Sequence, residues 1–402
     1  MIRSFSAKNF WSIKERQTID LVVDRHASDS EHFREVKDDD RVPTVVAVYG
    51  HNGSGKTALL RVPRFLADFL SNSFHYEASR DIGVQPFFSK DTEESPSELE
   101  LSFDLREKDD RWATYTYEIS VTRKRVLREA LYYTPERKRR LLFARHAGSG
   151  NAIELKTGAD FGVSANDAMR EKVAEKASVI STFAQFNHPI SIKIRDAAMP
   201  VFSNVFVFGR GDYPPEQSAS QLFDKDEEMR DWAKAFLHYA DLGIEDFSIH
   251  EHKNTSAPQP NHTAPTFTTL FTHTGLSRPL SYAEQSHGTQ AMYRLLPIVL
   301  GPLKFGTTSI VDEIDSDIHP LVMPKILDLF HSKKSNKLNA QLFLSGHNPY
   351  TLSFLEKEQV YFTEKDRNGQ TEVFGLQDIK GVRRSDNYFL KYLGGTYGGV
   401  PR

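Results

Sequence analysis

The 402-residue chain contains no cysteine, which excludes disulfides, thiolate metal ligands and a cysteine nucleophile. Long apolar runs are missing too, because no segment approaches the roughly 18 apolar residues that span a bilayer. The opening MIRSFSAKNFWSIKE lacks the apolar core of a signal peptide. With 51 basic and 54 acidic residues the net charge is only −3, so no overall field attracts nucleic acid. We therefore expect a soluble, cytoplasmic protein of one or two domains.

Hydrophobic periodicity divides the chain into strand-rich and helix-rich parts. Period-two alternation over 98–133 predicts a meander of antiparallel strands, and short strands are expected near 2–5 and 17–23. Helix and strand patterns then alternate over 286–362, which is typical of an α/β fold with a parallel sheet. The Pro- and Asn-rich stretch 251–265 predicts a loop.

The segment GHNGSGKT at 50–57 matches the phosphate-binding pattern G-x-x-x-x-G-K-[ST] at every fixed position. An apolar strand precedes it and a helical pattern follows, so backbone N–H groups and a helix N-terminus can face phosphate oxygens. Lys56 is expected to reach the β- and γ-phosphates and Thr57 to hold Mg²⁺. The expected nucleotide-binding residues of this loop are Asn52, Gly53, Ser54, Gly55, Lys56 and Thr57.

A second element of such a site is a hydrophobic strand that ends in acid, and residues 308–313, TSIVDE, supply it. Asp312 at the strand end is expected to hold the metal shell. Glu313 is expected to take a proton from the attacking water. An apolar run ending in Asp-Glu is common by itself. Its occurrence together with the glycine loop is what supports the assignment.

The 257 positions between Lys56 and Glu313 hold a further motif, the EQSHGTQ segment at 284–290. Here the sequence resembles the ATP-binding-cassette (ABC) ATPases, whose signature is a Ser-x-Gly pair at a helix start. A serine hydroxyl, free amides and a helix N-terminus together bind an anion. In that family the anion is the γ-phosphate held by the other subunit, which assigns the role to Ser286, Gly288 and Thr289. The alternative is a simple serine N-cap.

Three further elements agree with the same resemblance. Residues 314–320 are similar to the loop that crosses the dimer interface in these ATPases. His347, after the strand at 342–344, resembles the switch histidine that touches the γ-phosphate and orients the water. Gln85 is a candidate for the glutamine loop that completes the Mg²⁺ shell, although many glutamines fit that role.

The chain more closely resembles the ABC-type AAA ATPases of bacterial abortive-infection and other phage-defence systems, including the overcoming-lysogenization-defect and RloA ATPases. The segments that carry this resemblance are 9–12, 119–133, 181–187, 240–244, 284–290, 312–320, 345–348 and 392–401. It implies ATP and Mg²⁺ as cofactors, Glu313, His347 and Lys56 as catalytic residues, and an ATP-dependent homodimer with composite sites. It also implies a separate effector, a nuclease or toxin from the same operon, controlled by ATP hydrolysis in antiviral defence.

Two departures from relatives refine this expectation. Long coiled-coil heptads are absent, and only 55 residues follow His347, too few for a Toprim nuclease domain. The expected fold is therefore an α/β ABC-ATPase head with a mixed N-terminal sheet, a parallel core sheet and an inserted helical subdomain. We place an N-terminal ATPase lobe at 1–134, a mainly helical insertion at 135–245 and a C-terminal ATPase lobe at 246–402.

Basic residues concentrate at 123–128 and 137–140, and they keep open an alternative function as the DNA-binding ATPase subunit of a repair or nuclease complex. No aromatic residues interleave with them, so a solvated face or protein contact is favoured. Four histidines, at 250, 252, 262 and 273, lack regular zinc-ligand spacing. A transporter nucleotide domain and a non-hydrolysing scaffold are further alternatives.

Overall fold

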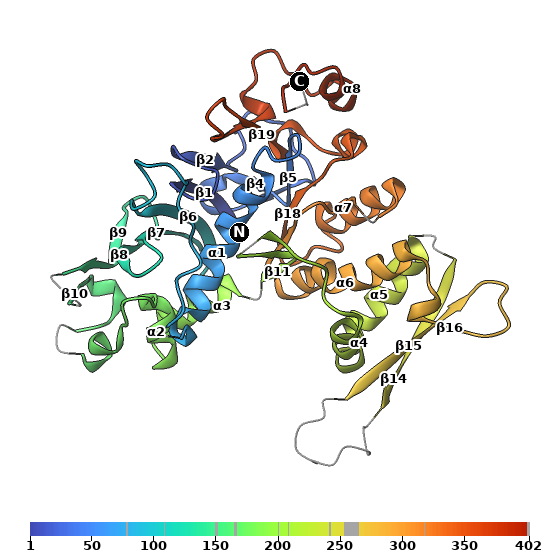
Figure 1. Ribbon diagram of the computed structural model, residues 1–402, viewed down its shortest axis with the longest axis horizontal. Helices are drawn as coiled ribbons and strands as arrows, with labels where there is room; N and C mark the ends of the chain where they lie inside the picture. Colours follow the sequence, from blue (N-terminus) through green and yellow to red (C-terminus); the bar gives the residue numbers. More distant parts are fainter. Residues whose placement is uncertain are drawn as a thin grey trace.

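The computed structural model describes residues 1–77, 79–107, 109–148, 152–164, 167–199, 201–207, 209–240, 243–252, 265–316 and 318–399. Two large sheets and the helices around them make up the fold (Figure 1). No helix in these ranges is both long enough and apolar enough to cross a membrane.

The first sheet has seven strands in the order β10-β9-β8-β7-β6-β1-β2. Every pairing in it is antiparallel, where a mixed sheet was expected. The middle strands follow one another through short connections, which favours antiparallel neighbours. Its strands are β1 (Ile2–Lys8), β2 (Gln17–Asp20), β6 (Ser97–Arg106), β7 (Trp112–Val121), β8 (Val126–Thr134), β9 (Arg140–Ala147) and β10 (Ile153–Thr157).

The core sheet has six strands in the order β11-β17-β18-β5-β19-β20, and all are parallel except the edge strand β20. Residues after 347 supply two of these strands, so the C-terminal segment completes the core sheet. The strands are β5 (Val45–Tyr49), β11 (Val201–Ser203), β17 (Thr308–Val311), β18 (Gln341–Ser345), β19 (Val360–Lys365) and β20 (Thr371–Gly375).

Alternate residues of β5 face two different hydrophobic cores. Val46 and Val48 join a core with the apolar face of α1 (Lys56–Asn72) and the antiparallel sheet. Val45 and Ala47 join a second core on the opposite face, with the helices α5 (Glu227–Tyr239), α6 (His287–Phe305) and α7 (Met323–His331). Because a strand with both faces buried is continuously apolar, the run VVAVY is explained by its central position.

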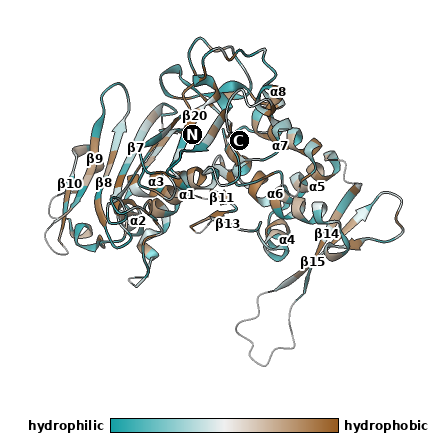
Figure 2. Ribbon diagram, turned by 45° about the horizontal axis from the view of Figure 1, so that its top comes forward, coloured by the Kyte–Doolittle hydropathy of each residue, from teal (hydrophilic) through white to brown (hydrophobic). Residues whose placement is uncertain are grey.

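The remaining helices lie around these layers, and a long hairpin of β14 and β15 projects beyond α4 and α5 (Figure 2). The helices are α2 (Val179–Gln185), α3 (Pro189–Ala198), α4 (Glu216–Lys225), α5 (Glu227–Tyr239), α6 (His287–Phe305), α7 (Met323–His331) and α8 (Tyr388–Leu393). The small strands are β3 (Phe33–Glu35), β4 (Arg41–Pro43), β12 (Val205–Phe206), β13 (Gly209–Arg210), β14 (Ile244–His252), β15 (Thr266–His273) and β16 (Leu280–Ser281).

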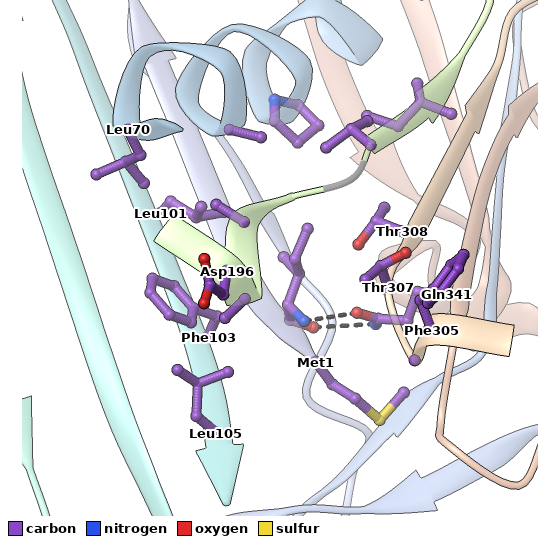
Figure 3. A pocket seen from close by; sticks show the side chains of 18 of the residues that line it. Met1, Leu70, Leu101, Phe103, Leu105, Asp196, Phe305, Thr307, Thr308 and Gln341 are labelled. Carbon is purple, nitrogen blue, oxygen red and sulfur yellow. Dashed lines mark hydrogen bonds between the residues drawn. The ribbon is translucent and has the colours of Figure 1, made fainter. Parts of the chain in front are cut away.

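The two large sheets are joined by the buried side chain of Gln341 on β18 (Figure 3). Its amide oxygen accepts a 2.5 Å hydrogen bond from the N–H of Ile2, and its Nε2 donates to the Ile2 and Pro43 carbonyls at 3.1 Å. The start of β1 is thereby fixed to the core sheet.

The prediction of a mainly helical insertion at 135–245 is wrong for its first part, because β9 and β10 extend the antiparallel sheet. Within this extension, Arg145 on β9 is buried and paired with the buried Glu129 on β8. In the same segment Ala168–Lys172 is a 3₁₀ turn, and the first α-helix begins only at Val179.

Candidate nucleotide-binding site

The glycine loop joins β5 to α1 at the carboxyl edge of the core sheet. Gly53 and Gly55 have φ angles of 77° and 110°, in the region that favours glycine. A Cβ on Gly55 would lie 2.1 Å from the hydroxyl of Thr371, so no side chain fits there. That hydroxyl donates a 3.0 Å hydrogen bond to the carbonyl of Ser54, and the Ser54 hydroxyl lies 2.6 Å from that of Thr363. Strands β19 and β20 thus fix the loop from the side.

Lys56 is buried at the first position of α1. Its ammonium group donates hydrogen bonds to the carbonyls of Gly50, at 2.8 Å, and His51, at 3.3 Å. Burial lowers the pKa of Lys56 from its usual value, while the nearby carboxylates of Asp312 and Glu313 oppose that shift. The charge is thus held inside the loop, where the first N–H groups of α1 also lack helical partners.

Thr57 and Asp312 meet although 255 positions separate them. The Thr57 hydroxyl donates a 2.6 Å hydrogen bond to the Asp312 carboxylate. The other oxygen of that carboxylate accepts from the hydroxyl of Ser345. These hard oxygen donors fit Mg²⁺, which takes one or two carboxylates and leaves its other positions to water and phosphate.

Glu313 follows Asp312 in a left-handed conformation, with φ at 51°. Its N–H donates to the Ser345 hydroxyl at 2.8 Å. Its carboxylate accepts a 2.5 Å hydrogen bond from Arg210 and lies 3.3 Å from Nε2 of His347. Partial burial raises the pKa of Glu313, but the hydrogen bond from His347 and the charge of Arg210 outweigh it and leave the pKa below its usual value.

The turn that carries His347 is fixed by Asp315, whose carboxylate accepts hydrogen bonds from the N–H groups of His347, at 2.9 Å, and Asn348, at 2.5 Å. A Cβ on Gly346 would lie 2.8 Å from the same carboxylate, so any larger residue would displace that carboxylate from its present position. The structure thus brings together the residues expected at this site from the glycine loop, the acidic strand and the switch turn.

Three residues of the site were missed by sequence reasoning. The fully buried Asn204 donates to the carbonyl of Asp312 at 3.0 Å and accepts from its N–H at 2.8 Å. Arg210 on β13 reaches Glu313 and also donates to the Ser316 hydroxyl at 2.6 Å. Asp315 holds the histidine turn. The first two lie in the segment interpreted as a helical insertion, and no motif marks them.

The expected signature forms the N-terminus of α6. Ser286 is the N-cap, and its hydroxyl accepts a 3.2 Å hydrogen bond from the N–H of Thr289. Ser286, His287 and Gly288 are exposed. Among the described residues, no hydrogen bond links this segment to the glycine loop, and its role toward a nucleotide stays a prediction.

Gln85 lies in a loop beside the Asn9–Ile13 turn, where its carbonyl accepts a 2.7 Å hydrogen bond from the N–H of Trp11. Among the described residues, no hydrogen bond joins the Gln85 side chain to Thr57 or Asp312, and its metal role stays a prediction.

The basic concentration is largely neutralised by ion pairs. Arg123 and Lys124 contact Asp81, Arg128 and Arg139 contact Glu118, and Arg140 contacts Asp160. This pairing favours the interpretation as a solvated face. Within the described residues no group of three or more histidines, aspartates or glutamates is placed to hold a metal, and His262 lies outside them.

Residues 45–353 match the family model described as an AAA domain, putative AbiEii toxin, type IV toxin–antitoxin system. That span contains the glycine loop, the acidic strand, the signature and the histidine turn. No curated protein matches the chain.

Solved structures of similar chains include the SMC head domain from Thermotoga maritima, at 12% identity, 93% coverage of this chain, 98% coverage of that chain and a TM-score of 0.43. An Smc head bound to the C-terminal winged-helix domain of ScpA is 13% identical, with 93% and 97% coverage and a TM-score of 0.46. An Smc head with an extended coiled coil, bound to a ScpA domain derived from Pyrococcus furiosus, is 12% identical, with 93% and 96% coverage and a TM-score of 0.44.

Proposed function

Because this chain belongs to the family of AAA domains described as putative AbiEii toxins of type IV toxin–antitoxin systems, we propose that it is an ABC-type ATPase that dimerises on ATP. The observation that carries this proposal is the convergence of Thr57, Asp312, Glu313 and His347 around the glycine loop. Such an arrangement holds a phosphate chain at one end and a water-activating carboxylate at the other.

Each residue has a part in the proposed reaction. The charge of Lys56 and the amides of the loop stabilise the phosphate oxygens. Thr57 and Asp312 would hold Mg²⁺, which when bound neutralises charge on the β- and γ-phosphates. Glu313 accepts the proton of a water whose oxygen bonds to the γ-phosphorus as the bond to the departing ADP oxygen breaks. His347 and Arg210 fix the Glu313 carboxylate in place.

The exposed Ser286 and Gly288 support the dimer. At the start of the 19-residue helix α6 they offer a hydroxyl, amides and the positive end of the helix dipole. In the proposed homodimer this terminus contacts the γ-phosphate bound by the second protomer. ATP then joins the two copies, and hydrolysis releases them.

The output of the cycle is proposed to be control of a separate effector protein in antiviral defence. This rests on the resemblance to abortive-infection ATPases and on the family description, which names a toxin–antitoxin system. Copurification of a partner with the ATP-trapped protein, and its loss with ADP, would support that control.

Phosphate release from ATP tests the enzymatic part. Activity should require Mg²⁺ and be lost in Lys56→Ala, whereas Lys8→Ala, at an exposed position of β1, should keep it. Equal rates in the wild type and Lys56→Ala would contradict the proposal.

A further inference from the structure

A cavity of about 560 Å³ runs beside α1 and begins one helical turn beyond Thr57. Arg61, Arg64 and Asp68 line it from one face of the helix, because positions three and four apart share a face. The turn at Phe10–Trp11, the segment 75–83 and the tip of the β12–β13 hairpin form the other walls. Its volume lies within the range of small-molecule sites, roughly 300–1,000 Å³.

Positive charge dominates this cavity, since Arg61, Arg64 and Arg80 face a single carboxylate, Asp68. Asp68 already accepts hydrogen bonds from Asn72, at 2.9 Å, and from the hydroxyl of Tyr76, at 2.6 Å. The guanidinium of Arg64 comes only within 3.5 Å of it.

Two nitrogens of these arginines are buried without a hydrogen-bond partner, Nε of Arg61 and Nε of Arg64, and Nη1 of Arg64 has only the 3.5 Å ion pair with Asp68. Buried donors in folded proteins are nearly always satisfied. Guanidinium groups in this situation match an acceptor-only anion such as phosphate.

Aromatic rings lie among the cations. The Arg61 guanidinium stacks 3.8 Å from the ring centroid of Trp11, and that of Arg80 lies 5.6 Å from the ring of Tyr76. Phe206, at the hairpin tip, is 52% exposed. Arginine planes and aromatic faces are the surfaces on which nucleic-acid bases stack.

A comparison within the same molecule shows that this composition is unusual. Another surface cavity is also lined by basic and aromatic residues, but four acidic side chains balance its four basic ones. Its members with charge are Arg106, Arg111, Arg140, Lys193, Glu107, Asp109, Glu136 and Asp160.

We propose that the cavity beside α1 binds a small nucleotide ligand, with an aromatic base and at least two phosphate groups, at a site separate from the glycine loop. Arg61 and Arg64 would hold phosphate and Phe206 would stack on a base. The α1 wall from Arg61 to Asn72 is about 16 Å long, which accommodates more than one phosphate.

A ligand in this cavity affects the carboxylate of Glu313 through the β12–β13 hairpin. Phe206 is in β12, and β12 pairs with β13, which carries Arg210 to Glu313. A ligand that joins Phe206 to α1 therefore biases the position of Arg210. This regulatory consequence rests on the proposed ATPase function, whereas the binding itself does not.

Calorimetric titration of the full chain with the 5′-phosphorylated diadenylate pApA tests the proposal, with the glycine loop saturated by Mg²⁺ and ADP. We expect one site per chain. Arg64→Gln should weaken binding by about tenfold or more, as expected for loss of a charged hydrogen bond. Phe206→Ala, at an exposed position, should weaken it severalfold. The matched control is Arg106→Gln. Arg106 lines the balanced cavity and lies over the ring of Trp112, and its replacement should leave pApA binding unchanged.

Four results would overturn the ligand site. The first is no binding of pApA at millimolar concentration, and the second is equal pApA affinity in the wild type, Arg64→Gln and Phe206→Ala. The third is complete competition by ADP. The fourth is affinity that keeps rising with oligonucleotide length. The last result would assign the cavity to a longer nucleic-acid groove. Because pApA binding is measured without turnover, an inactive ATPase that binds pApA would separate failure of the proposed function from failure of this site.

Discussion

The hydroxyl of Thr57 donates a 2.6 Å hydrogen bond to the carboxylate of Asp312, across 255 positions of sequence. This contact joins the first turn of α1 to the end of β17, two strands away from β5 in the core sheet. Both oxygens are suited to one Mg²⁺ ion, and we propose that the two halves of the chain share a metal at this pair.

Replacement of either member should separate nucleotide binding from hydrolysis. Thr57→Ala and Asp312→Asn should each lower kcat by roughly a hundredfold or more, since the metal's charge stabilisation is weakened. Binding of a fluorescent ADP in the presence of EDTA should remain close to that of the wild type. Thr57→Ser keeps the hydroxyl and should retain most of the activity. Full Mg²⁺-dependent turnover by Thr57→Ala would contradict this assignment.

Glu313→Gln should trap the ATP-bound dimer. The amide cannot take a proton from water, and loss of a general base costs roughly 10²–10⁴-fold in rate. Light scattering after gel filtration should show a stable dimer with ATP and a monomer with ADP. If the variant stays monomeric with ATP under conditions in which the wild type dimerises, the composite-site model fails.

The pH dependence of turnover should depend on Arg210. Partial burial raises the pKa of Glu313, and His347 and Arg210 lower it further than burial raises it. Arg210→Gln removes one of the groups that lower the pKa of Glu313, so Glu313 should become protonated at a higher pH. The acidic limb of the plot of kcat against pH should therefore move to higher pH. Arg111→Gln, which removes an exposed arginine paired with Asp109, should leave that limb in place.

The same pKa shift has a consequence for stability. A carboxylate with a lowered pKa in the folded state stabilises the fold at pH values above its unfolded pKa. That contribution is lost as the pH falls through the lower, folded value.

A uniform fall in kcat at every pH in Arg210→Gln, with no movement of the acidic limb along the pH axis, would show that Arg210 has only a structural role.

Asn204 offers a test of how the acidic strand end is held. Asn204→Ala leaves the N–H and carbonyl of Asp312 without their side-chain partners in a buried position. We expect the free energy of unfolding to fall by about 2–4 kcal/mol, because each unsatisfied buried group costs about 1–3 kcal/mol. Urea denaturation measures this loss. Asn368→Ala, in an exposed turn, is the control and should change stability by less than about 0.5 kcal/mol.

Local patterns were enough to predict which residues the structure gathers at the ends of regular strands. The glycine loop, Asp312, Glu313 and His347 each follow an apolar strand, and parallel strands end at one edge of a sheet. Arg210 and Asn204 could not be predicted, because two very short strands place them and their partners are about a hundred positions away. Burial of Arg145 depends on Glu129, which is equally invisible to a pattern of polar and apolar residues.

Complementation between two inactive variants is the most direct test of the shared site. Ser286→Arg fills the exposed start of α6 with a bulky cation and should prevent closure over the nucleotide of the other protomer. Lys56→Ala disables the glycine loop of its own protomer. Each variant alone should be inactive. A mixed dimer, however, contains one site formed by the intact Lys56 of one copy and the intact Ser286 of the other.

An equimolar mixture should therefore recover up to about a quarter of the wild-type rate, since about half of randomly formed dimers are mixed and each has one working site of two. Mixing Lys56→Ala with Glu313→Gln provides the control, because both changes affect the same half of the site. Each protomer of that mixed dimer still lacks one member of its own catalytic set, so no activity should return. Recovery in the control, or none in the Ser286→Arg mixture, would show that Ser286 does not complete the site of a second copy.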